Sequence, residues 1–257
     1  MRILGLMMVR NGEDRVKYAL DSMALCCDAI CVLDDRSVDR TPEILRTHPA
    51  VTNTFTADSA ISQEDWFFPE SRCLDLLYRM ADFYVPDWIV AVDHDQIIEP
   101  AREVRQILSS VEANFSVVKT SCVSVWRDQR YPLMVPLLSP AKSLQGRIWR
   151  YYPGLTAGSK PLHNGHSPSN ISNFGDTKTI DTITFYHYGW DTLQKRIDKV
   201  NFYTSLDPTY EYNFNVPYDR SLLFGYKRHA IDELIRGYRT KFDEYKRLDK
   251  PFVSSHL

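Results

Sequence analysis

The segment WIVAVDHD, from Trp88 to Asp95, is a five-residue apolar run followed by two aspartates that a histidine separates. An apolar run of this length is typical of a strand buried on both faces of a sheet. If the strand geometry continues beyond Val92, Asp93 and Asp95 point to the same side. The segment therefore predicts a buried strand whose carboxyl end presents two carboxylates together.

Two strands of the same kind lie upstream. Residues 3–9 and 29–33 are continuous apolar runs, and the second ends at Asp34 and Asp35. Helical spacing of apolar residues, and proline early in a first turn, predict helices between the strands. The predicted helices are 13–25, 39–46, 70–83 and 99–111, and 51–56 is a further strand. Buried strands that alternate with helices predict an α/β fold, with an open, mostly parallel twisted sheet flanked by helices.

The second half of the chain is less regular. Residue patterns predict three strands and two helices, the last helix having its apolar residues on one face, and the segment 153–176, rich in Gly, Pro, Ser and Asn, predicts a long loop. The strands are 116–126, 143–151 and 179–188, and the helices are 192–203 and 229–248. A loop this long inside a compact domain is often functional. We expect a single domain with two halves, residues 1–112 and an irregular C-terminal region, 113–257.

Composition narrows the class of protein. The 257 residues carry a formal charge of −2, which disfavours nucleic acid as a partner without excluding it. The chain has no apolar run of about 18 residues that could span a bilayer, and its first nine residues predict a strand rather than a signal peptide. Five cysteines without a C-x-x-C pair indicate buried thiols in a reducing cytoplasm rather than disulfides or zinc.

The two acidic strand ends carry the functional argument. Ligands of open parallel sheets bind outside the carboxyl ends of the strands. Two carboxylate clusters at that edge do not stabilise a fold, because like charges repel and are costly to desolvate. They suit a divalent cation, sugar hydroxyls or the N–H groups of a base. The alternative is that these aspartates are solvated turn residues or helix caps.

Three segments resemble, in order and spacing, the family 2 glycosyltransferases of the GT-A fold. They are MVRNGED at 8–14, VLDDRSVDRTPEIL at 32–45 and the segment 88–95, so the resemblance covers about residues 1–110. It implies an inverting glycosyltransferase with a nucleotide-diphosphate sugar as donor, a UDP-sugar being favoured, and Mn²⁺ or Mg²⁺ as cofactor. Residues 1–112 would bind the sugar donor, and residues 113–257 would supply acceptor and catalytic elements.

The resemblance also implies roles for individual residues. The nucleotide pocket would be lined by Val9, Arg10, Asn11 and Glu13 after the first strand, with Asp34, Asp35 and Ser37 near the base and Arg72, Asp93 and His94 completing it. Asp34 would accept from the base N–H, and Asp93 would hold ribose or metal-bound water. Asp95 would ligate the metal. The family often has glycine where this chain has Arg36, so a cation could stand near the donor.

Later segments resemble a subset of the family more loosely. They are RIWR at 147–150, LH at 162–163 and FYHYGW at 185–190, and they imply His187 as a third metal ligand. A satisfied core histidine is the alternative for His187. The subset often has Glu after His163, where this chain has Asn164, and an amide cannot take the acceptor proton. The candidate bases are His163 first and Asp191 second, then His166, Asp176 and Asp181.

Other interpretations remain beside the transferase. A degenerate protein that binds a nucleotide-sugar without turnover fits Asn164. A metal-dependent nucleotidyl or phosphoryl transferase lacks the expected Gly-rich phosphate loop. A zinc site at His163 and His166 has no cysteine ligands nearby. Aromatic residues that could stack on a sugar, with core packing as the alternative, are Trp66, Phe67, Phe68, Trp126, Trp149 and Tyr152. The acceptor is not indicated.

Overall fold

The computed structural model describes residues 1–57, 70–126, 131–132, 142–159 and 165–189. The chain divides into two compact units. The first is Met1–Ser121 with Leu144–Phe185, and the second is Cys122–Ser143 with Tyr186–Leu257. The predicted helices 192–203 and 229–248 lie outside the described residues, as do the candidate bases His163 and Asp191 and the aromatic residues 66–68.

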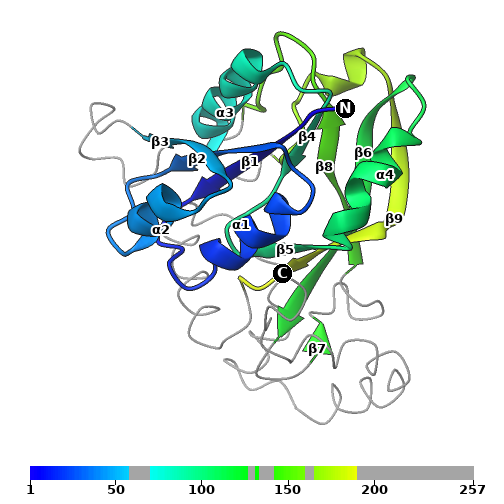
Figure 1. Ribbon diagram of the computed structural model, residues 1–257. Helices are drawn as coiled ribbons and strands as arrows, with labels where there is room; N and C mark the ends of the chain where they lie inside the picture. The colour runs from blue at the N-terminus through cyan, green and yellow to red at the C-terminus, as the bar shows by residue number, and fades with distance from the viewer. Residues whose placement is uncertain (58–69, 127–130, 133–141, 160–164, 190–257) are drawn as a thin grey trace. The chain divides into compact units, whose positions relative to one another are not determined.

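The strands form one open sheet in the order β3-β2-β1-β4-β8-β6-β9-β5 (Figure 1). They are β1 (Ile3–Val9), β2 (Ala29–Asp34), β3 (Val51–Thr56), β4 (Trp88–Ala91), β5 (Gln96–Glu99), β6 (Phe115–Trp126), β7 (Tyr131–Pro132), β8 (Lys142–Arg150) and β9 (Asp176–His187). The first four in the order pair in parallel, and β8 joins β4 antiparallel. The predicted open, mostly parallel sheet flanked by helices is confirmed.

The helices are α1 (Val16–Ala24), α2 (Thr41–Thr47), α3 (Glu70–Tyr84) and α4 (Val104–Ser109), with 3₁₀ turns at Ala101–Glu103 and Ile171–Asn173. The predicted helix over 99–111 is wrong at its start. Gln96–Glu99 forms β5 with Ile97 and Ile98 buried, and α4 begins only at Val104. Short β7, for which the sequence predicts no strand, pairs antiparallel with β6.

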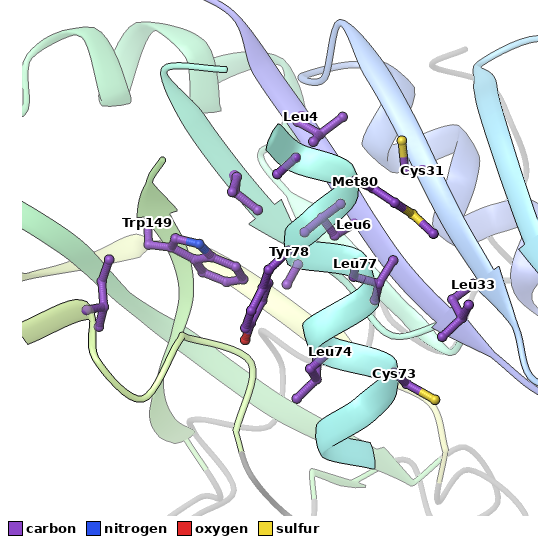
Figure 2. Packing of buried hydrophobic residues seen from close by; sticks show 14 of the residues in the cluster. Leu4, Leu6, Cys31, Leu33, Cys73, Leu74, Leu77, Tyr78, Met80 and Trp149 are labelled. Atoms are coloured by element: carbon purple, nitrogen blue, oxygen red, sulfur yellow. The ribbon is translucent and has the colours of Figure 1, made fainter. Parts of the chain in front are cut away.

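Strand β1 is covered on both faces, as its unbroken apolar run predicted. Leu4 and Leu6 belong to the buried cluster on the α3 side (Figure 2). Gly5 points to the opposite face, where an added Cβ would lie 2.5 Å from Cε of Met23 on α1. Helix α1 therefore packs directly on the β1 backbone, while α3 packs on side chains.

Helix α3 anchors the site-bearing strands. Its buried residues Leu74, Leu77 and Tyr78 recur at helical spacing and pack with Leu6 of β1 (Figure 2). Each fully buried leucine contributes about 2 kcal/mol of transfer free energy. Trp149 of β8 meets Tyr78 edge-on, with ring centroids 5.9 Å apart and planes at 84°. This cluster helps to hold β8 beside β4, the strand with which it pairs.

In the second unit, Val123 and Tyr186 form a small buried cluster with Tyr188 against it. Among the residues that the structure describes, no helix is long and apolar enough to cross a membrane. None of the five cysteines forms a disulfide, and four of them are buried.

Candidate active site at the carboxyl edge of the sheet

The carboxyl ends of β1, β2 and β4 meet at one edge because the three strands are parallel. Val9, the last residue of β1, is in register with Asp34, the last residue of β2. The Asp35 N–H donates to the Val9 carbonyl at 2.8 Å. The loops that follow these strands, 10–15 and 35–40, therefore run side by side.

Side-chain hydrogen bonds tie these two loops together. The Asn11 N–H donates to Oγ of Ser37 at 2.8 Å, and the Val38 N–H donates to Oδ1 of Asn11 at 2.9 Å. The Gly12 N–H donates to Oγ1 of Thr41 at 2.8 Å. Asn11 has φ +50°, a left-handed conformation that asparagine tolerates better than most residues. Asn11 and Ser37, predicted to line the nucleotide pocket, thus also shape the loops that form it.

Glu13 takes part in the same network, which explains why α1 begins at Val16 rather than at Glu13. The Glu13 N–H donates to Asp39, and Oε2 of Glu13 accepts from the Arg40 N–H at 3.0 Å. Burial acts to raise the pKa of Asp39, but hydrogen bonds from Thr41 and from the Glu13 backbone leave its pKa below the ordinary value. A charged Asp39 therefore bridges the two loops.

The carboxylates that end β2 are buried and differ in their partners. Oδ1 of Asp34 accepts from the Ser37 N–H at 3.1 Å. Asp35 accepts from two arginines: Nη1 of Arg10 lies 3.2 Å from Oδ2, and Nε of Arg36 lies 2.9 Å from Oδ1. Two carboxylates can be buried here because guanidinium groups and a backbone N–H compensate them.

Arg36 has an uncommon backbone conformation, φ +55°. A left-handed conformation costs a non-glycine residue about 1–2 kcal/mol, whereas glycine adopts it readily. The structure thus gives a physical reason for glycine at this position in the family that the motifs resemble. Arg36 keeps the conformation and adds a cation.

Residues 93–96 form a turn rather than a continued strand. Strand β4 ends at Ala91, and the Gln96 N–H donates to the Asp93 carbonyl at 3.0 Å. The expectation that Asp93 and Asp95 point the same way assumed that the strand continues beyond Val92, and this assumption is wrong. Asp93 is partly exposed, whereas Asp95 is 8% exposed.

Both carboxylate oxygens of Asp93 have partners from distant segments. Nη1 of Arg147 on β8 lies 3.0 Å from Oδ2, and Nε2 of His166 lies 3.3 Å from Oδ1. The Arg147 side chain is only 5% exposed, and its Nε donates to Gln145. The Tyr78 hydroxyl donates to the His166 carbonyl at 2.8 Å, which ties the loop to α3. Asp93 and His166 also line a small pocket whose other walls, including Trp149, are mostly apolar.

Sequence reasoning did not assign Arg147 a role, and it ranked His166 among the lower candidates for the base. A signal for Arg147 was present, since a charged residue beside Ile148 and Trp149 in a buried strand needs a buried counter-ion. The neighbouring Arg150 is structural. It stacks on Trp88 at 4.2 Å and donates to backbone carbonyls of the α4–β6 connection and Phe115.

The other predicted residues are dispersed. Arg72 is exposed on α3, and the buried Val9 contributes its carbonyl. His187 is half-buried at the end of β9 and belongs to the second unit. Asp176 and Asp181 are exposed on β9. Trp149 is fully buried and packs in the core, whereas Tyr152 stacks on the partly exposed Phe174 with centroids 4.4 Å apart.

The residues at this edge suit a metal ion only in part. Among the described residues, no group of three or more His, Cys, Asp or Glu side chains is placed to hold an ion. The Asp93 oxygens are engaged, which leaves Asp95 as the protein carboxylate of choice. Mg²⁺ and similar ions commonly use one or two carboxylates and take further ligands from substrate phosphates. This edge therefore fits an ion that arrives with a diphosphate.

Gly12→Ala is expected to destabilise the protein by about 1–3 kcal/mol and to weaken nucleotide binding. A Cβ at Gly12 would lie 2.7 Å from Cδ2 of His94 and 2.8 Å from Cγ2 of Val9. The His94 ring must then move, and the 93–96 turn with it. Urea unfolding and nucleotide titration measure the two effects. Gly154→Ala meets no atom within 4 Å of its Cβ but has φ +78°, so it measures the cost of backbone strain alone, without a steric clash. Unchanged stability of Gly12→Ala would contradict the packing.

Comparison with solved structures identifies the fold. S. aureus TarS, residues 1–349 in complex with UDP-GlcNAc, superposes with a TM-score of 0.52 at 14% identity, over 73% of this chain and 58% of that one. The longer TarS structure gives 0.50 at 16% identity, over 82% of this chain and 41% of that one. The chain has the GT-A glycosyltransferase fold. The fold predicted from the three motifs is thereby confirmed.

Sequence comparison finds relatives at two levels of similarity. An uncharacterized protein of Mycobacterium tuberculosis is 44% identical over 241 residues, which are 94% of this chain and 59% of that protein. An uncharacterized glycosyltransferase of Rickettsia prowazekii is 21% identical over 207 residues, 79% of this chain and 66% of that protein. The chain thus spans about three fifths of the length of its mycobacterial relative. No family model matches the sequence.

Proposed function

We propose that the protein transfers a sugar from a nucleotide-diphosphate sugar to an acceptor. The observation that carries the proposal is the convergence of buried carboxylates and their cationic partners at the carboxyl edge of a GT-A sheet. Open α/β sheets bind ligands at this edge. The structural neighbour TarS was solved with UDP-GlcNAc, which supports a UDP-sugar as the donor.

The residues divide the work as follows. Asp34 accepts from the base N–H, and the loops joined through Asn11, Glu13 and Ser37 form the walls around the nucleotide. Asp93, oriented by Arg147 and His166, accepts from ribose or from metal-bound water. Arg10, Arg72 and His94 complete the pocket.

Asp95 would ligate Mn²⁺ or Mg²⁺, with His187 as a further ligand. When bound there, such an ion would supply charge stabilisation for the departing nucleotide diphosphate. Binding donor and acceptor in line supplies the entropic part of the rate enhancement, and attack from the opposite face inverts the anomeric carbon. His163 and then Asp191 remain the proposed bases, and the acceptor is open. A reducing cytoplasm remains the proposed compartment, because none of the five cysteines forms a disulfide.

The test is a titration and turnover assay with UDP-, GDP- and dTDP-sugars, with and without Mn²⁺. We expect one donor to bind and to release its nucleoside diphosphate, at least slowly by transfer to water. Binding without release would favour a degenerate nucleotide-sugar-binding protein. Release of pyrophosphate, or of a phosphorylated product, would favour the nucleotidyl or phosphoryl transferase and refute glycosyl transfer.

A further inference from the structure

Asp35 already has one cationic partner, Arg10, so Arg36 is not required to neutralise its charge. The Asp35 side chain is 9% exposed and already has Arg10 at 3.2 Å from Oδ2. Arg36 adds Nε and Nη2 at 2.9 Å from Oδ1. One carboxylate thus has two guanidinium partners at the edge where the sheet binds its ligand.

The backbone at Arg36 shows that this second cation is retained at a cost. Its φ of +55° is a conformation that glycine would adopt without strain. Strained residues of this kind cluster at ligand-binding sites, where surrounding contacts hold them. Here those contacts are the bonds from Arg36 to Asp35 and from the Ser37 N–H to Asp34.

The chemistry around Arg36 suits one edge of a base. Asp34, two residues earlier, has Oδ1 bonded to Ser37 and presents a carboxylate acceptor. A guanidinium carries five N–H groups in a rigid fork, and the Arg36 side chain is 25% exposed. An acceptor and a donor side by side complement an N–H beside a carbonyl. Uracil, thymine and guanine have such an edge, whereas cytosine and adenine do not.

We propose that Arg36 is a base-recognition residue: oriented by Asp35, its guanidinium donates to the base carbonyl adjacent to the N–H that Asp34 accepts. This inference rests on the proposed function, because it requires a nucleotide at this edge. It assigns the donor to the nucleotides of uracil, thymine or guanine. Because Asp35 holds the fork before binding, little side-chain entropy is lost when the base arrives.

The experiment titrates UDP, GDP and CDP into the full chain and into Arg36→Gly, Arg36→Lys and Val85→Gly. Wild type should bind UDP or GDP at least about ten-fold more tightly than CDP. Arg36→Gly should lose about ten-fold for the preferred nucleotide and little for CDP, so the preference collapses. Arg36→Lys keeps the charge but not the fork, and should retain part of the preference.

Val85→Gly is the matched control for the backbone. Val85 has φ +43°, is exposed after α3, and lies outside the loops that bind the nucleotide. Arg36→Gly and Val85→Gly both remove the backbone strain of a left-handed residue. We expect Val85→Gly to raise the melting temperature and to leave nucleotide affinity unchanged. A loss of affinity in Arg36→Gly alone would then come from the lost guanidinium and not from the relieved strain. The melting temperature of each Arg36 variant also shows that it is folded.

Three results would overturn the inference. Equal losses for UDP, GDP and CDP in Arg36→Gly would mean that Arg36 contacts the phosphates. Unchanged affinity in Arg36→Gly would mean that Arg36 only stabilises Asp35. A wild-type protein that binds none of the nucleotides, with or without Mn²⁺, would refute the proposed function itself and the inference with it.

Discussion

Asp95→Asn is expected to abolish the Mn²⁺-dependent part of nucleotide diphosphate binding and to reduce turnover by about 100-fold or more. Asp95 is 8% exposed in the 93–96 turn. Both oxygens of the neighbouring Asp93 are already within 3.3 Å of Arg147 and His166. Asp93 is therefore poorly placed to replace Asp95 as the anionic metal ligand, and an amide is a much weaker ligand for a hard cation.

The measurement is calorimetric titration of the nucleotide at several Mn²⁺ concentrations, followed by donor turnover. Asparagine preserves the volume of the side chain, and thermal unfolding checks that the variant is folded. Asp82→Asn, on the exposed surface of α3, is the control for loss of one carboxylate. If Asp95→Asn responded to Mn²⁺ like wild type, the assignment of the metal to Asp95 would be wrong.

Arg147→Met is expected to lower the free energy of unfolding by about 2 kcal/mol, because it removes the buried cation beside Asp93, a carboxylate that is 27% exposed and keeps His166 as a partner. The Arg147 guanidinium is 5% exposed and lies 3.0 Å from Asp93, 54 residues away in sequence. Methionine keeps most of the apolar volume, so the loss reports on the charge pair. Turnover should fall as well, since Asp93 loses the group that orients it.

A double-mutant cycle with Asp93→Asn isolates the pair. We expect a coupling free energy of at least about 1.5 kcal/mol from urea unfolding, with the double variant less destabilised than the sum of the single ones. The exposed pair Lys178–Glu112 gives the matched comparison, and its coupling should be much smaller than that of Asp93 and Arg147. Strict additivity for Asp93 and Arg147 would contradict an energetically important ion pair.

Local pattern was sufficient for the elements that end at the site. The predicted strands 3–9 and 51–56 match β1 and β3 residue for residue, and α3 extends one residue beyond its predicted range. The signals for β1 and α3 are an apolar run and apolar residues at helical spacing, which local sequence carries directly, whereas β3 is exposed over nearly its whole length. Strand β5 was missed because Gln96–Glu99 is short and follows a turn, so its place depends on its sheet neighbours.

The functional side chains depended on both levels. The motifs led to Asp34, Asp93 and Asp95, and parallel strand ends brought the acidic residues to one edge. The motifs did not show that Asn11, Glu13 and Ser37 form hydrogen bonds between two loops, because those bonds join residues 26–27 positions apart. The spacing of residues within one segment gives no information about contacts between distant segments.

The sequence by itself determined the alternation of strands and helices, the acidic strand ends and the resemblance to a GT-A enzyme, because each depends on short stretches of chain. Only the tertiary structure decided which charge faces which. It turned Asp93 toward Arg147 and His166, buried Asp35 between Arg10 and Arg36, and placed Trp149 in the core. Burial makes an unpaired charge so costly that partners distant in sequence must meet, and packing alone settles where they do so.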